Sequence, residues 1–250
     1  MTNSEKISFL RTFRKFQKSR EIYYKPKAQK ILQDQVKQFI KTQDIHSIAF
    51  QPMFDFLLHL YQEVSRVWGH KVHLSIKQQI TKSRQPIGFS QRLYDILKNN
   101  YGIDLLKDSM DITQTTKDDI QKILTDAAAS GIGIDEIAKQ ISQQGFTDVR
   151  ARMIARTEVV KAANVAGDII AKESGLQMNK EWLAVLDSRT RSDHREVHGT
   201  IVDHDATFDV GSYPMRFPGD SKYDAPAKEI INCRCVCIYL AKRDSNGKLI

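Results

Sequence analysis

The residues best suited to chemistry gather in the last third of the chain. His194 and His198 stand four residues apart, so they share one face of a helical turn. Cys233 and Cys235 flank a single residue, so they share one face of a strand. Two imidazoles and two thiolates are a suitable tetrahedral donor set for zinc.

The cysteine spacing argues against that zinc site. Zinc-binding cysteines usually stand two to four residues apart, and an extended C-x-C segment would hold its two sulfurs too far apart for one ion. We therefore expect no cofactor and no metal, with zinc held by His194, His198, Cys233 and Cys235 as the alternative.

Asp187 and His194 raise a second chemical alternative, a hydrolase or nuclease that works with or without a metal at Cys233 and Cys235. The sequence has no phosphate-cradling glycine loop and no paired carboxylates at a fixed spacing. If these residues have a purely structural role instead, both cysteines are small buried side chains. Asp187 then forms an ordinary salt bridge with Arg189 or Arg191 across a turn. We expect no catalytic residues and no enzyme activity, and we keep the hydrolase as the alternative.

The positive charge of the chain lies at its N-terminal end. Residues 1–41 carry 11 Lys and Arg against three acids, whereas the remainder has 27 of each sign. Such asymmetry indicates a polyanionic or acidic partner. The alternative without a partner is a helix whose basic face is solvated and whose stripe of aromatic side chains packs against the rest of the chain. The residues expected to contact DNA or an acidic protein surface are Arg11, Arg14, Lys15, Lys18, Arg20, Lys25 and Lys27.

Membrane insertion and secretion are not expected. No apolar run approaches the roughly 18 residues that a bilayer-spanning helix needs. The first 20 residues have no uninterrupted apolar core of the kind found in signal peptides. All three cysteines lie within Cys233–Cys237, which is no disulfide framework and fits a reducing compartment.

Apolar residues at helical spacing predict a mostly helical first two thirds. We expect one helix up to Arg20 and a second that starts at Pro26, because proline suits a first helical turn. A third helix is expected over 52–80, with Trp68 in the core. A short helix should end at the turn 99–102.

Helix starts and ends can also be predicted in the centre of the chain. Thr115 or Thr116, followed by acids, predicts a helix start, and that helix should end near Gly131. A short helix is expected over 134–144. Thr147 is expected to cap a long, alanine-rich helix that ends at Gly175 and carries Arg156 and Glu158 as a partly buried ion pair.

Beyond Gly175 the apolar spacing changes to that of strands. Strands are expected over 180–186, 200–202 and 235–240, with a long loop over 203–232. A loop of this length is either functional or held by specific contacts. The fold class is therefore α+β, mainly α: a helical N-terminal half, a long central helix, and a small C-terminal module with a short β-sheet and a long loop.

An ordered series of motifs runs through the second half of the chain. It consists of ARTE, KAANVAG, W-x₄-D-x-RTR-x₂-H-x₄-G, a loop rich in Phe and Pro, and NCRC. The series resembles the phage Mu F-like minor head proteins, also called head morphogenesis proteins, over about residues 100–240. The matching positions are Arg156, Thr157, Glu158, Asn164, Trp182, Asp187, Arg189, Arg191, His194, Gly199, Phe208, Pro226, Cys233, Arg234 and Cys235. His198 departs from the family pattern, so the resemblance does not support a metal site that uses it.

The resemblance implies a minor structural protein of a tailed-phage head. Such a protein would associate with the portal, the packaged double-stranded DNA and other head proteins, in head assembly or genome delivery. It would lie inside the virion head near the portal, and in the host cytoplasm during assembly. The implied organisation is a basic N-terminal arm and helical docking region over 1–100 and a Mu F-like domain over 101–250. Within that domain, helices cover 116–174 and a small α+β module covers 180–241.

Overall fold

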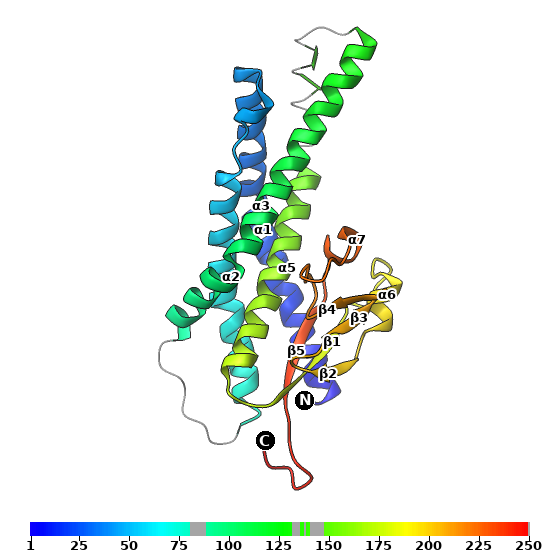
Figure 1. Ribbon diagram of the computed structural model, residues 1–250. Coiled ribbons are helices and arrows are strands. Elements are labelled where there is room, and N and C mark those ends of the chain that lie inside the picture. The colour runs from blue at the N-terminus through cyan, green and yellow to red at the C-terminus, as the bar shows by residue number, and fades with distance from the viewer. Residues whose placement is uncertain (81–88, 132–135, 138, 141–147, 250) are drawn as a thin grey trace.

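Four long helices lie side by side, and a small β-containing module packs against one flank of them (Figure 1). The computed structural model describes residues 1–80, 89–131, 136–137, 139–140 and 148–249. The four helices are α1 (Asn3–Thr42), α2 (Gln51–Lys77), α3 (Phe89–Ser130) and α5 (Asp148–Glu173). This confirms the expected class, α+β and mainly α. Among the described helices, none is both long and apolar enough to cross a bilayer.

Helix α1 is continuous through Pro26, so the predicted break between two helices is wrong. The helix starts with a capping box, in which Thr2 and Glu5 satisfy each other's backbone N–H groups. Proline removes one helical hydrogen bond and frees the carbonyl four residues earlier, at Ile22. Pro26 and Ile22 are both exposed, so water can reach that carbonyl. Packing on either side of Pro26, through the buried Tyr24 and Ala28, holds the helix together.

The aromatic stripe of α1 belongs to the core. Phe9, Phe13 and Phe16 surround Trp68 of α2, with ring centroids 5.0–5.3 Å apart. Trp68 is 1% exposed, as predicted for a core residue. The basic segment expected as an arm is therefore an integral helix of the bundle, and only its polar face is available to a partner.

Helix α3 covers two predicted interruptions, and both predictions are wrong. The expected turn at 99–102 is helical, and the expected helix start at Thr115 or Thr116 lies inside the helix. Thr116 is buried and donates its hydroxyl to the carbonyl of Ile112, so it does not cap a terminus. The predicted end at Gly131 is confirmed by its φ of 66°. Most of the short helix expected over 134–144, and the Thr147 cap, lie outside the described residues.

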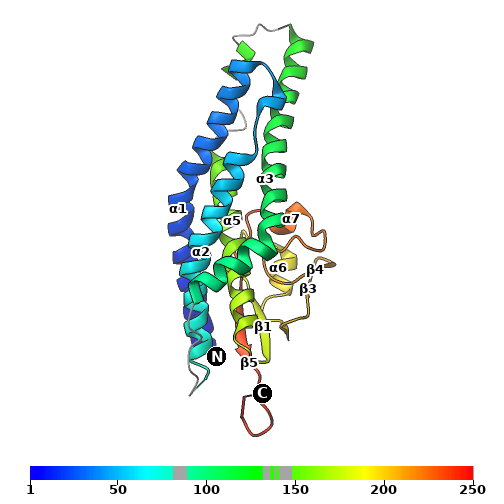
Figure 2. The same cartoon turned by 60° about the vertical axis from the view of Figure 1, so that its left-hand side comes forward.

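Helix α5 lies at the centre of the molecule and contacts α1, α2 and α3 (Figure 2). Small side chains permit these close contacts: Ala151, Ala155, Ala162, Ala163 and Ala166 are fully buried. The helix ends where Gly175 adopts a φ of 70°, as the sequence predicts.

The C-terminal module consists of two small antiparallel sheets and two short helices. The first sheet has the order β2 (Ile201–Asp203), β1 (Met178–Leu183), β5 (Val236–Ala241), which confirms the three expected strands. The predicted long loop is not structureless: it holds the hairpin β3 (Phe208–Val210) and β4 (Tyr213–Met215) and the helix α7 (Ala227–Ile230). A further short helix, α6 (Ser192–Glu196), follows β1.

Strand β5 lies at one edge of its sheet, and amide side chains from the helical side satisfy that edge. Asn164 of α5 donates to the carbonyl of Cys235 and accepts from the N–H of Cys237. Gln79, just beyond the end of α2, makes the same pair of contacts further along β5, donating to Tyr239 O and accepting from Ala241 N. An open strand edge would otherwise invite pairing with another chain.

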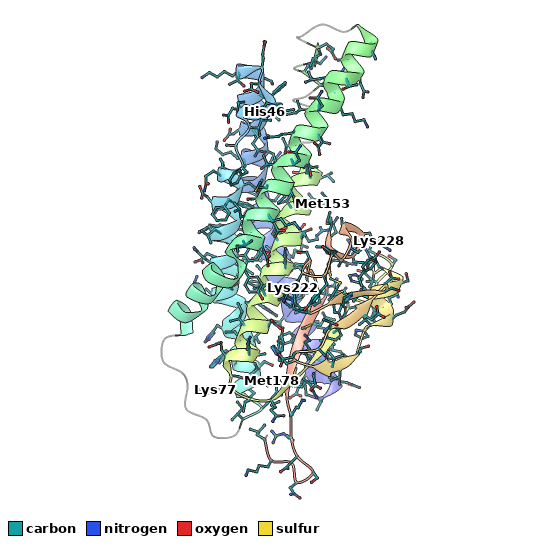
Figure 3. The ribbon with its side chains drawn as sticks, viewed as in Figure 1. His46, Lys77, Met153, Met178, Lys222 and Lys228 are labelled. Atoms are coloured by element: carbon teal, nitrogen blue, oxygen red, sulfur yellow. The ribbon has the colours of Figure 1, made fainter. Side chains whose placement is uncertain are left out.

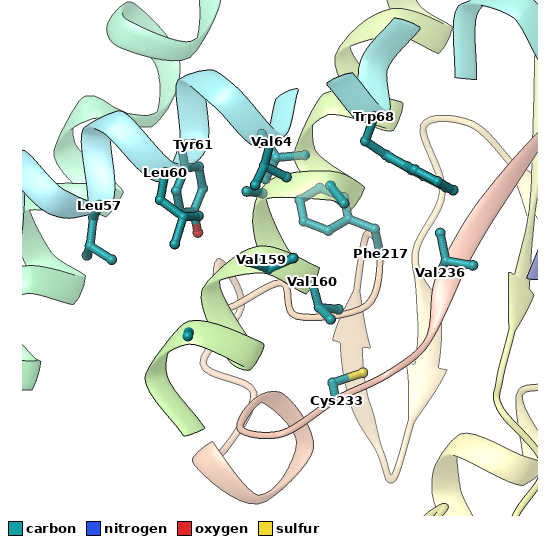
Figure 4. Packing of buried hydrophobic residues seen from close by; sticks show 14 of the residues in the cluster. Leu57, Leu60, Tyr61, Val64, Trp68, Val159, Val160, Phe217, Cys233 and Val236 are labelled. Atoms are coloured by element: carbon teal, nitrogen blue, oxygen red, sulfur yellow. The ribbon is translucent and has the colours of Figure 1, made fainter. Parts of the chain in front are cut away.

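Side chains from the bundle and the module meet in one core. Figure 4 shows Val64 and Trp68 of α2 and Val160 of α5 beside Phe217 and Val236 of the module. Further along α5, Met153 lines a cavity together with Ala227 and Ile230 of α7; Figure 3 labels Met153 and, on α7, Lys228. The module is therefore fixed on the bundle by a shared hydrophobic interior.

The close approach of α5 to β5 at Gly167 gives a testable prediction. A Cβ at this position would lie 2.8 Å from Cε2 of the buried Tyr239 ring. Gly167→Ala should therefore lower the free energy of unfolding by about 1–3 kcal/mol, as overpacking does. Gly102→Ala is the matched helical control, because a Cβ there meets no atom within 4 Å. The free energy of unfolding of Gly102→Ala should instead rise by about 0.5–1 kcal/mol, because alanine is favoured over glycine inside a helix. Equal stability of the two variants in urea would contradict the close contact.

Candidate functional site

His194 and two cysteines form a buried cluster between α6 and the segment that leads into β5. His194 Nδ1 lies 3.3 Å from Cys235 Sγ and 3.7 Å from Cys233 Sγ. On the other side of the ring, Nε2 lies 3.1 Å from Glu229 Oε2 on α7. All four side chains are at most 2% exposed. Glu229 was not identified from the sequence, because nothing in its spacing relates it to His194.

The cysteine geometry corrects the spacing argument made from the sequence. Residues 233–235 lie just before β5, and the chain turns immediately ahead of them, where Asn232 has a φ of 60°. The backbone N–H of Cys235 then points to Cys233 Sγ at 3.5 Å. The two sulfurs and His194 offer ligand atoms that all lie within 4.8 Å of one another. The prediction that one intervening residue separates the sulfurs too far is therefore wrong.

The close contacts shift the pKa values of this cluster. A hydrogen bond with Cys235 and the neighbouring His194 hold the pKa of Cys233 well below its usual value, against the effect of burial. The same hydrogen bond with Cys233, together with burial, raises the pKa of Cys235. Burial opposes protonation of His194, but its contacts with Cys233 outweigh burial and raise the pKa of this histidine.

His198 lies outside the cluster. Its Nδ1 accepts a hydrogen bond from the N–H of Ala184 at 3.0 Å. Helix α6 ends at Glu196, so His194 and His198 do not share a helical face. The structure brings together three of the four predicted zinc ligands.

Asp187 is held by Arg234, the residue between the two cysteines. The two terminal guanidinium nitrogens of Arg234, Nη1 and Nη2, each lie 2.6 Å from one carboxylate oxygen. The hydrogen bonds from Arg234 and from the backbone of Arg189 hold the pKa of Asp187 below its usual value. Arg191 donates to the carbonyl of Ile231. The predicted pairing of Asp187 with Arg189 is present at 3.4 Å. The closer pairing with Arg234, at 2.6 Å, was not predicted from the sequence.

Trp182 and Gly199 support this arrangement. The Trp182 ring is fully buried and contacts the rings of His194 and Phe208 edge-on, at 5.5 and 5.3 Å. Gly199, with a φ of 80°, donates its N–H to the carbonyl of Trp182. The role predicted for these residues as a structural motif around the NCRC segment is consistent with these contacts.

Arg156 and Glu158 point to opposite sides of α5, so the predicted ion pair between them is wrong. Arg156 makes a bidentate contact with Glu21 of α1, at 2.8 and 2.9 Å, and lies 3.4 Å from Asn232 Oδ1. Residues 156 and 158 are two apart, and residues at that spacing do not face each other on a helix. Arg156 therefore connects α1, α5 and the NCRC segment, while Glu158 faces α2.

Glu158 belongs to a buried polar group between α2, α3 and α5. It accepts a hydrogen bond from Tyr61 at 3.0 Å, and Lys161 lies 2.6 Å from Asp108. Burial and the Asp108 charge raise the pKa of Glu158 to about 7. Glu158, Lys161 and Asp108 line a cavity of about 540 Å³, to which Arg150 and Ser221 also contribute.

A basic groove lies between α1, α5 and the module. It has a volume of about 890 Å³, and among the described residues nine cationic side chains line it against a single acid, Glu21. The cations come from three parts of the chain: Arg11, Arg14, Lys15, Lys18 and Lys25 from α1, Arg152 and Arg156 from α5, and Arg189 and Arg234 from the module.

The groove contains five of the seven basic residues predicted from the sequence. Arg20 lies over the Phe16 ring, and Lys27 lies over the Tyr23 ring and donates to its hydroxyl. Neither lines the groove. The four cations from α5 and the module were missed because charge counting along the sequence cannot show which distant segments share a surface.

The raised pKa of Glu158 predicts a pH-dependent stability. Its native pKa of about 7 exceeds the usual 4.5, so the native state binds more protons between these values, and stability falls as pH rises through this range. Glu158→Gln removes the titrating group and keeps an acceptor for Tyr61. The free energy of unfolding of the variant, relative to that of the original protein, should therefore rise by about 1–3 kcal/mol between pH 5 and pH 8.

Urea unfolding at the two pH values measures this difference. Asp126→Asn, on the exposed face of α3, controls for the loss of one negative charge. Stability curves of the original protein and Glu158→Gln that run parallel from pH 5 to pH 8 would refute the prediction.

Comparison with known proteins gives two relatives. The minor head protein GP7 of Bacillus phage SPP1 is 33% identical over 116 residues, 44% of this chain and 36% of that protein. The NAD(+)--arginine ADP-ribosyltransferase EFV of Enterococcus faecalis (strain ATCC 700802 / V583) is 36% identical over 107 residues, 41% of this chain and 21% of that protein. The chain thus spans about a third and about a fifth of these relatives' lengths. No solved structure matches.

Residues 118–238 match the family described as Phage Mu protein F like protein. The match begins within α3 and includes α5, the His194 cluster, the Asp187–Arg234 pair and the first half of β5. Over this segment the chain is similar to the phage Mu F-like family, which confirms the resemblance predicted from its ordered motifs.

Proposed function

We propose that this protein is a minor structural component of a tailed-phage head that binds packaged double-stranded DNA through the basic groove. The family match and the minor head protein of phage SPP1 support the head component. The groove supports the DNA contact, and it is the observation that carries the proposal. A position near the portal, contacts with other head proteins and a part in head assembly or genome delivery belong to the same proposal.

The free cations of the groove form one stripe on α1. Arg11, Arg14, Lys15 and Lys18 are exposed and follow the i, i+3, i+4, i+7 spacing of a single helix face. Among the described residues that line the groove, no acid pairs with any of the four, so their charges are available to phosphates. From Arg11 to Lys18 the stripe is about 10 Å long, close to the rise of about three base pairs.

The cations that α5 and the module contribute to the groove already form ion pairs with acidic side chains. Arg156 is bound to Glu21, and Arg234 to Asp187. Arg152 is paired with Asp148, four residues earlier on α5. These ion pairs fix the guanidinium groups, which reduces the side-chain entropy that a bound polyanion would have to remove. The arrangement suits contacts with the phosphate backbone, which carry no sequence information.

The hydrolase alternative receives less support from the geometry. Asp187 is occupied by Arg234, and the imidazole of His194 is occupied on both sides by Glu229 and the cysteines. His194 is 2% exposed, so a substrate could reach it only after the module opened. We therefore propose no catalytic role for either residue.

A triple substitution tests the groove. Replacing Arg14, Lys15 and Lys18 with alanine should weaken binding to a duplex of about 30 base pairs at least about tenfold in low salt. The slope of log K against log salt should become shallower by about 0.9 for each phosphate that the variant no longer neutralises. Fluorescence anisotropy over a salt series measures both quantities with the full chain.

The control removes three other exposed lysines, Lys37, Lys41 and Lys71, none of which lines the groove. It should leave the affinity within about twofold of that of the original protein. An equal fall in affinity in both triple variants would reject the groove as the binding site. Failure of the original protein to bind duplex DNA in low salt would reject the DNA contact.

A further inference from the structure

The His194 cluster has the composition and arrangement of a metal site. One imidazole nitrogen and two thiol sulfurs face a common point from α6 and from the segment before β5. All three residues are buried. The nearest basic residue in sequence, Arg234, turns outward to Asp187 and away from the two sulfurs. The donors therefore face inward, away from solvent and from the groove.

We propose that His194 Nδ1, Cys233 Sγ and Cys235 Sγ bind a zinc ion. Tetrahedral zinc has Zn–S distances of about 2.3 Å and Zn–N distances of about 2.0–2.1 Å, which place N and S about 3.5 Å apart. The observed separations from Nδ1 to the two sulfurs are 3.3 and 3.7 Å. Only small adjustments are needed to bring the three atoms around one ion. A water molecule would supply the fourth donor.

The surroundings of the cluster fit a zinc-bound histidine. With its proton on Nε2, His194 would donate to Glu229, and the lone pair of Nδ1 would then be available to the ion. A carboxylate on the far nitrogen of a metal-ligating histidine is a common arrangement. Two donors are also available to the sulfurs: the N–H of Cys235, and the buried Nε1–H of Trp182, which has no nitrogen or oxygen partner among the described residues. Two thiolates would balance the charge of the ion.

A bound ion would tie three parts of the module together. It would join α6 to the NCRC segment directly and to α7 through Glu229. Arg234 lies between the two cysteine ligands, and its side chain lines the basic groove. The ion would thus hold one wall of the groove. The zinc proposal itself does not depend on DNA binding.

Metal analysis of the full chain, produced without a histidine tag in zinc-supplemented medium, tests the site. Mass spectrometry of the dialysed protein should find about one zinc per chain. His194→Ala, Cys233→Ser and Cys235→Ser should each remove at least about nine tenths of it. Cys237→Ser and His198→Ala are the matched controls and should keep it, because Cys237 is equally buried but outside the cluster and His198 binds Ala184.

Cobalt titration of the metal-free original protein covers the case in which ligand variants fail to fold. Cobalt bound by two thiolates should give sulfur-to-metal charge-transfer absorption at one equivalent. Glu229→Gln should weaken metal affinity by about 10–100-fold, as removal of a histidine-orienting carboxylate does. Less than about 0.1 zinc per chain together with no charge-transfer band would overturn the proposal. Zinc removed equally by Cys237→Ser, or copper or iron in place of zinc, would also overturn it.

Discussion

The edge of strand β5 is the constraint on which the rest of the molecule depends. This strand is paired on one side only within its sheet, so its outer N–H and C=O groups need partners. Asn164 and Gln79 supply them in succession along the strand, each amide accepting from one N–H and donating to one carbonyl. Gly167 allows the Tyr239 ring to lie against α5. The helical bundle thereby completes the hydrogen bonding of the sheet.

This junction places the module's charged residues beside α1. Cys235, held by Asn164, adjoins Arg234, whose guanidinium reaches Asp187 and the groove. On the helical side, Arg156 joins Glu21 to Asn232. The groove is therefore built from the same contacts that fix the module on the bundle. Its cations come from segments more than 100 residues apart in sequence, and neither half of the chain forms it alone.

The sequence predicted the parts of this fold that depend on local patterns. Apolar spacing identified α2, and the glycines at 131 and 175 marked the helix ends because their backbones adopt positive φ. The three strands of the first sheet were also predicted. Pro26 and the turn-like residues 99–102 were misread, because tertiary packing keeps α1 and α3 helical where local preference favours a break.

The candidate site was predicted only in part, for a related reason. His194, Asp187 and the NCRC segment were recognised from residue type and order. The contacts that define their roles join residues far apart in the chain, such as Glu229 with His194 and Arg234 with Asp187. No spacing rule reports them. The C-x-C argument failed because spacing along the chain does not fix the distance between two side chains: both sulfurs and the His194 ring lie within 4.8 Å of one another.

The central claim is that α1, α5 and the module form one surface for a nucleic-acid backbone. Formaldehyde crosslinking of the full chain to a duplex of scrambled sequence, followed by peptide mapping, tests it most directly. The structure predicts that crosslinks concentrate at Lys15, Lys18 and Lys25, which line the groove, and not at Lys37, Lys41 or Lys71. Crosslinks spread evenly over these six lysines, or confined to the last three, would contradict the claim.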